Sequence, residues 1–120
     1  MEQNVNLAEK FSLFAEHWSP KIVAELNDNY VKVVKIEGEF VWHHHDDEDE
    51  LFLVVSGRLR MQFRDGDVVL EPGELIVVPR GIEHCPVAES ETHVVLIEPK
   101  TTLNTGNVRG ERTIEELERL

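Results

Sequence analysis

The chain has 120 residues, of which 41% are hydrophobic and 30% charged, a composition typical of a globular domain and not of a disordered segment. It carries 24 acidic against 12 basic residues and a formal net charge of −12, so no nucleic-acid partner is expected, because this field repels polyanions. No apolar run approaches the roughly 20 residues needed to span a bilayer, so no membrane partner is expected either.

Two features favour a cytoplasmic location. Residues 1–6 contain no basic stretch followed by an apolar one, which argues against a secretory signal peptide. Cys85 is the single cysteine of the chain, which excludes an internal disulfide and suits a reducing compartment. We expect Cys85 to be a buried, unreactive thiol.

The first predicted element is a helix over about residues 7–18. Asn6 followed by Glu9 has the pattern of a capping box, which begins a helix. Apolar residues then recur at helical spacing and form one face: Leu7, Phe11, Phe14 and Trp18. Pro20 limits the helix at its far end. This face is expected to pack on the body of the fold or on a partner subunit.

Seven short segments then have the pattern of strands. They are rich in β-branched or aromatic residues and are separated by Gly, Pro or Asp turns: 31–36, 39–45, 51–56, 58–64, 68–70, 75–78 and 94–98. Segment 58–64 alternates polar and apolar residues, which indicates an antiparallel sheet with one buried face. Many short strands with almost no helix between them predict an all-β sandwich or barrel.

The C-terminal part is predicted to be a polar tail followed by a short helix. Residues 101–112 are polar and include two glycines, whereas Thr113 and Glu116 form a second capping-box pattern. The chain is therefore expected to form a single domain over residues 1–120, with its barrel core at about 31–99 and the tail and short helix at about 101–120.

A histidine cluster lies at the end of the second predicted strand. Strand alternation places His43 and His45 on the same face as Val41 and turns His44 away. Two imidazoles two residues apart on a strand can reach one metal ion. Burying them without a partner costs desolvation energy. The pattern therefore predicts two metal ligands on the interior face.

A carboxylate and a further histidine are candidates to complete this site. Alternation allows either Asp49 or Glu50 to face inward, and the nearly continuous apolar run 51–55 leaves the choice open. His84 follows the turn at 79–81, and the residues around it do not distinguish a ligand from a structural histidine.

The spacing of these residues resembles the two cupin motifs. The first motif is a glycine, His-x-His, four residues, Glu, six residues and a glycine, and it is matched by Gly38, His43, His45, Glu50 and Gly57. The second motif is matched by Gly73, Pro79, Gly81 and His84. The resemblance covers about residues 31–99. The whole sequence is similar to small single-domain bacterial cupins of the mannose-6-phosphate isomerase-like group.

The resemblance implies a six- to eight-stranded, RmlC-like antiparallel jelly-roll barrel with a metal site inside one end. It implies that one divalent transition metal ion (Fe, Mn, Ni, Zn, Co or Cu) is bound by His43, His45, Glu50 and His84. Glu50 is favoured over Asp49 because six residues separate it from Gly57, as in the motif.

The sequence departs from the cupin motifs at two positions. Four residues separate Gly38 from His43, where the usual motif has five, and the usual spacing would nominate His44 and Asp46. Strand alternation and the Trp-His-x-His form of many small bacterial cupins favour His43 and His45 instead. Ala88 stands where the second motif ends in Asn, a residue that is not a metal ligand in the family.

The resemblance implies a metal-dependent enzyme that acts on a small organic substrate, of the dioxygenase, isomerase or lyase type. The alternative is a non-catalytic cupin that binds or senses a small ligand or metal, because a fold does not by itself fix a function. Candidate second catalytic groups are Tyr30, Lys35 and Gln62. Cupins are commonly dimers, and the aromatic face of the predicted N-terminal helix needs a covering surface, so we expect a homodimer.

Overall fold

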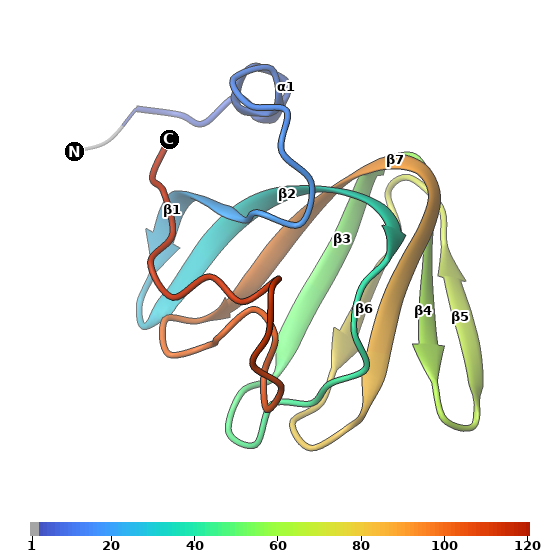
Figure 1. Cartoon of the computed structure of the whole chain (residues 1–120). Helices are drawn as coiled ribbons and strands as arrows, with labels where there is room; N and C mark the ends of the chain where they lie inside the picture. The colour runs from blue at the N-terminus through green and yellow to red at the C-terminus, as the bar shows by residue number, and fades with distance from the viewer. Residues whose placement is uncertain (1–2) are drawn as a thin grey trace.

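The computed structural model describes residues 3–120, which form an antiparallel β-barrel with one short helix (Figure 1). Every strand pairing is antiparallel. In chain order the elements are α1 (Leu7–Phe11), β1 (Lys21–Leu26), β2 (Asn29–Glu39), β3 (Glu50–Ser56), β4 (Leu59–Phe63), β5 (Gly66–Leu70), β6 (Leu75–Val78) and β7 (His84–Pro99). The all-β barrel expected from the strand pattern is thereby confirmed.

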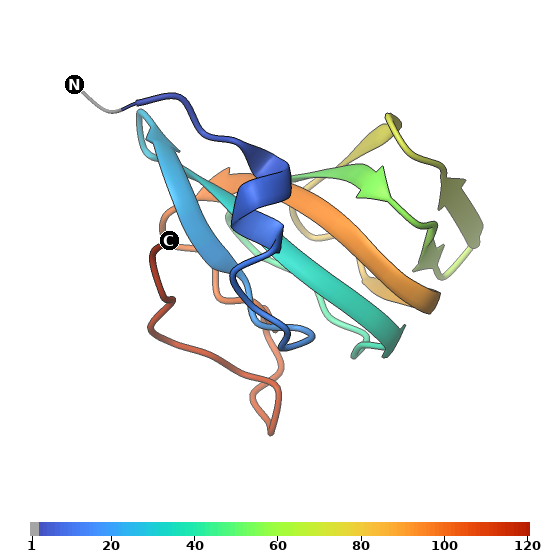
Figure 2. The same ribbon diagram turned by 90° about the horizontal axis from the view of Figure 1, so that it is seen from above.

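The long strand β7 joins the two halves of the barrel. One edge of β7 pairs with β2 along most of its length, and the other pairs with β4 near His84 and with β3 near Leu96. The remaining strands extend this arrangement, in the order β1-β2-β7-β3-β6 and with β5 beyond β4. Strand β7 bends across the whole molecule (Figures 1 and 2). As a result, β2, β3, β4 and β7 all contribute side chains to one buried cluster.

Every second side chain along these strands fills the barrel interior, because successive side chains of a β-strand point to opposite faces of the sheet. The main buried cluster includes Val34, Ile36, Phe52, Val54, Leu59, Met61, Val94 and Leu96. Val94 is paired with Val34 on one side and with Val54 on the other, so three strands contribute to one layer of the core. Full burial of each such side chain contributes about 1.5–3 kcal/mol to folding.

Helix α1 lies across the outer face of β1, β2 and β7 (Figure 2). The side chain of Asn6 accepts a hydrogen bond from the Glu9 amide at 3.0 Å, as the capping-box pattern predicts. The predicted extent of this helix, 7–18, is wrong, because α1 ends at Phe11. Phe14 packs in the outer cluster, whereas Trp18 packs against the interior cluster, and one continuous helix face cannot serve both.

The predicted C-terminal helix is also absent from residues 101–120, which form turns and bends. The Thr113 hydroxyl lies 2.7 Å from that of Thr105 and accepts from the Gly110 amide, so it does not cap a helix. The segment crosses one end of the barrel and returns to β1, where the Leu120 amide donates to the Ile22 carbonyl at 2.9 Å. Within residues 3–120, no helix has the length and apolarity required to cross a membrane.

Candidate metal centre

The four residues with metal-ligand chemistry come together at one end of the barrel interior. His43 and His45 lie between β2 and β3, Glu50 begins β3 and His84 begins β7. One potential ligand atom from each lies within 4.8 Å of those of the other three, and all four side chains are buried. The structure therefore brings together the residues that the motif spacing selected.

The segment that carries the first two histidines is not the continuous strand 39–45 that the sequence predicted. β2 ends at Glu39, and His43 then makes a single antiparallel bridge to His84, with N–O distances of 3.0 and 2.9 Å. The carbonyl of His45 accepts from the amide of Gly81 at 2.7 Å. Despite the irregular backbone, His43 and His45 turn inward and His44 does not, so the predicted alternation of sides holds.

Backbone carbonyls fix the tautomers of two histidines. Nδ1 of His43 lies 2.8 Å from the carbonyl oxygen of Val41, and Nδ1 of His84 lies 2.8 Å from that of Ile82. Because a carbonyl only accepts, each Nδ1 carries the proton and each Nε2 keeps its lone pair. Burial, followed by the neighbouring His84, lowers the pKa of His43 to about 4, which keeps its imidazole in the neutral, metal-binding form.

Three atoms that face one another in the cluster make no hydrogen bond of normal geometry within residues 3–120. They are all buried: Nε2 of His45, Nε2 of His84 and Oε1 of Glu50. The carboxylate oxygen lies 2.9 Å from the first nitrogen and 3.2 Å from the second. An unsatisfied buried polar atom costs about 1–3 kcal/mol, which a shared cation would remove. Three imidazoles and one carboxylate suit a divalent transition metal ion, so the residues present fit such an ion.

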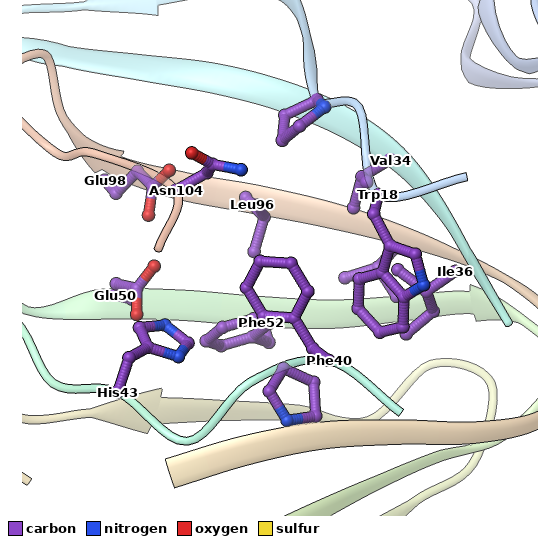
Figure 3. Close-up of a pocket in the computed structure, with 13 residues that line it drawn as sticks. Trp18, Val34, Ile36, Phe40, His43, Glu50, Phe52, Leu96, Glu98 and Asn104 are labelled. Atoms are coloured by element: carbon purple, nitrogen blue, oxygen red, sulfur yellow. The ribbon is translucent and has the colours of Figure 1, made fainter. Parts of the chain in front are cut away.

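A buried Lys–Glu pair adjoins the cluster. Nζ of Lys32 lies 2.7 Å from Oε1 of Glu98, and Figure 3 shows the Glu98 carboxyl group at the same end of the cavity as Glu50. Burial and the charge of Glu50 raise the pKa of Glu98 well above its usual value. Burial opposes ionisation of Glu50 as well, but the neighbouring side chains of Glu98, His45 and His84 outweigh it and hold the pKa of Glu50 well below its usual value.

Sequence reasoning missed Lys32 and Glu98, although a signal was present. Lys32 has the same strand parity as Val34 in β2, and Glu98 has the same parity as Leu96 in β7. Both apolar residues belong to the interior cluster. A charged residue that continues an inward-facing series is therefore a candidate for burial, even when composition suggests a solvated side chain.

A cavity of about 50 Å³ opens beside the cluster (Figure 3). Its apolar walls include Trp18, Val34, Ile36, Phe40, Phe52, Val94 and Leu96. Its polar end is formed by His43, Glu50, Glu98 and Asn104. The predicted catalytic candidates Tyr30, Lys35 and Gln62 do not line it, and Lys35 instead donates to the Phe14 carbonyl at 2.6 Å. The cavity therefore combines an apolar body with one polar end.

The alternative ligands considered from the sequence lie elsewhere. Asp49 is exposed, and its carboxylate accepts from the Arg80 amide at 2.8 Å and from the Arg80 guanidinium. These bonds hold the pKa of Asp49 below its usual value. Nε2 of His44 lies 3.0 Å from Asp46, which is also exposed. Cys85 is buried, as expected, and its burial followed by the nearby charge of Glu39 raises its pKa to about 11.

The chain resembles proteins of known structure over most of its length. A cupin-2 domain containing protein from Shewanella frigidimarina is 51% identical with a TM-score of 0.79, and the match covers 80% of this chain and 94% of that one. Protein NMB1881 from Neisseria meningitidis is 30% identical with a TM-score of 0.75, covering 82% of this chain and 100% of that one.

Curated relatives match over a shorter stretch. Protein YdbB from Bacillus subtilis is 40% identical over 63 residues, which are 52% of this chain and 56% of YdbB. The acireductone dioxygenase from Bacillus subtilis is 35% identical over 80 residues, covering 62% of this chain and 45% of the dioxygenase. The chain thus spans about half the length of the curated relatives it matches.

A family comparison agrees with the fold and with the residue cluster. Residues 30–99, more than half of the chain, match the model of the cupin domain. The mannose-6-phosphate isomerase-like subgroup is not confirmed by these matches. The strands that match this domain also bring the buried histidines and Glu50 together. The chain belongs to the cupin family, and it is a metal-binding cupin.

Proposed function

We propose that the chain holds one divalent transition metal ion and uses it to act on a small organic molecule in the adjoining cavity. The proposed ligands are His43, His45, Glu50 and His84. The observation that carries this proposal is the set of unpartnered buried atoms that converge at the polar end of an otherwise apolar cavity. A metal ion with open positions can polarise an oxygen donor of a bound molecule or hold it beside O₂.

Among possible reactions we favour dioxygenation. Support comes from the similarity to the acireductone dioxygenase of Bacillus subtilis, at 35% identity over 80 residues. Isomerase and lyase chemistry are the alternatives, and they would use a different metal ion at the same ligands. Because the chain spans about half the length of that relative, we do not assign the substrate of the dioxygenase to this chain.

Glu98 favours an enzyme over a passive binding module. A binding site needs walls and an anchor, whereas catalysis also needs a group that exchanges protons with the bound molecule. Glu98 supplies a carboxyl group at the polar end in addition to the four proposed ligands. Lys32 holds this carboxyl group in place at 2.7 Å. The apolar walls would exclude water from the bound molecule and orient it toward this end.

The first experiment is metal analysis of protein purified without an affinity tag. We expect about one equivalent of a transition metal ion in the wild type and a large loss in H43A and in E50A. The matched neighbours H44A and D49A should retain the metal, because both side chains point away from the cluster. A folded wild type that neither contains nor takes up metal would overturn the proposal, as would loss of metal from the neighbour variants alone.

The reaction class has a separate test. Iron(II)-loaded protein is incubated with small enediols and 1,2-dihydroxy compounds while O₂ uptake is recorded. Dioxygenation predicts substrate-dependent O₂ uptake that falls in E98Q with the metal content unchanged. Turnover without O₂ uptake would assign isomerase or lyase chemistry. Metal binding without turnover of any compound would favour the non-catalytic alternative.

A further inference from the structure

Arg112 is exposed and does not itself line the cavity, but it packs on the outer edge of the cavity's aromatic wall. Trp18 and Phe40, which both line the cavity, are stacked with their ring centroids 4.7 Å apart. The guanidinium carbon of Arg112 lies 5.3 Å from the centroid of Trp18 and 5.7 Å from that of Phe40. These contacts place a cation beside the apolar body of the cavity.

The charge of Arg112 is uncompensated, in contrast to that of the other arginines. Within residues 3–120, Arg112 has no carboxylate partner within 4.0 Å. The remaining arginines all have one: Arg58, Arg60, Arg64, Arg80, Arg109 and Arg119. In a chain with 24 acidic residues, an arginine held at a cavity rim without an acidic partner is available to an anionic ligand.

The backbone of Arg112 is tied to a residue of the cavity. Asn104, at the polar end, donates from Nδ2 to the carbonyl of Arg112 at 2.7 Å and accepts from the amide of Ile114 at 2.9 Å. The hydroxyl groups of Thr105 and Thr113 lie 2.7 Å apart in the same loop. The loop therefore anchors the backbone of Arg112 to a residue that lines the cavity.

With a divalent ion bound at the proposed ligands, the charge inside the cavity would also favour an anion. The two positive charges of a divalent ion exceed the single negative charge of Glu50, and the ion pair of Lys32 with Glu98 adds no further negative charge. A buried excess of positive charge is unfavourable unless a counter-charge is present. An anionic ligand supplies that counter-charge, whereas a neutral one does not.

We propose that the cavity takes a small organic carboxylate, which pairs with Arg112 at the rim while a second oxygen donor faces the metal centre. This inference rests on the proposed function and specifies its substrate class. It requires a short, largely apolar body between two oxygen groups, because the walls between the rim and the metal centre are aromatic and aliphatic.

The test uses zinc-loaded protein and short hydroxy acids from glycolate to 5-hydroxypentanoate, each compared with its neutral amide by calorimetry. At least one acid should bind roughly tenfold or more tightly than its amide, the effect expected of a charge-assisted pair. This preference should disappear in R112Q, survive in part in R112K and remain in R109Q. Arg109 is the matched control because it is exposed, lies in the same loop and pairs with Glu115.

The outcomes separate this inference from the proposed function. If all variants bind zinc but no acid binds more tightly than its amide, the carboxylate inference is wrong and the metal site stands. The inference is also wrong if R112Q keeps the full preference for the acid. If the folded wild type binds no zinc, the proposed function itself fails. A preference that weakens with added salt in the wild type supports a partly exposed ion pair.

Discussion

Lys32 and Glu98 form an ion pair inside the barrel, with the ammonium nitrogen 2.7 Å from the carboxylate oxygen and both side chains 2% exposed. They come from neighbouring strands, β2 and β7, and both face inward. A buried pair of this kind repays its desolvation only when both partners are present. Glu98 lines the cavity, whereas Lys32 and Tyr30 line a second hollow beside the C-terminal segment.

Removing the positive partner should strongly destabilise the barrel. The variant K32M leaves the carboxyl group of Glu98 buried beside Glu50, and breaking a buried pair in this way costs about 3–5 kcal/mol. Urea unfolding of metal-free protein measures the change in the free energy of unfolding.

A double variant tests whether the two residues are coupled. The loss of stability in K32M/E98Q should be smaller than the sum of the losses in K32M and E98Q, because the double variant leaves no unpaired charge buried. K100M, which breaks the exposed pair with Glu25, is the control and should have little effect. Additive effects of K32M and E98Q would contradict the coupling.

Gly106 places the C-terminal segment directly on the backbone that carries the histidines. Its φ is +57°, and a Cβ atom there would collide with the carbonyl oxygen of His44 and lie 3.1 Å from Cδ2 of His43. G106A should therefore shift His43 and weaken metal binding by roughly tenfold or more, a loss of about 1.4 kcal/mol. G73A is the matched control, since Gly73 has φ +86° but no atom within 4 Å of the added Cβ. Equal metal affinities of the two variants would show that only backbone strain matters.

The meeting of the four cluster residues was predictable because their spacing matches the cupin motifs. Strand alternation alone predicted that His43 and His45 share a side, and the resemblance added Glu50 and His84, which the structure places beside them. This is why the proximity survives although 40–45 is not a regular strand. Their role as ligands remains a prediction.

Other features were not predictable from local pattern. Phe14 and Trp18 have the spacing of one helix face, but tertiary packing sends them to opposite sides of the sheet, and no local signal reports this. Strand β1 was missed because KIVAEL has only a short apolar run beside Pro20. Strand parity places Glu98 on the inward side with Leu96, but its burial depends on Lys32, which lies 66 positions away in the chain. Long-range pairing decides each of these cases.

Cys85 should be nearly unreactive in the folded protein at neutral pH. Burial, followed by the charge of Glu39, raises the pKa of its thiol to about 11, so the nucleophilic thiolate is scarce. Alkylation by iodoacetamide at pH 8 should be at least tenfold slower than in protein unfolded by guanidinium, and E39Q should accelerate it. Rapid modification of folded wild type at pH 8 would disprove the assignment. The raised pKa also predicts that stability falls as the pH rises from about 9 towards 11, because the unfolded chain loses this proton first.

Loading with metal should stabilise the fold through the cluster itself. An ion that binds only the folded state, at a free concentration of one hundred times its Kd, adds about 2.7 kcal/mol to the free energy of unfolding. Thermal unfolding of wild type should therefore shift upward with added zinc and return to its starting value with a chelator. H84A should lose this shift. H17A should keep it, because His17 pairs with Glu91 outside the cluster. A zinc-dependent shift of equal size in H84A would locate the binding site elsewhere, since a metal that stabilises through His84 must lose that stabilisation when the imidazole is removed.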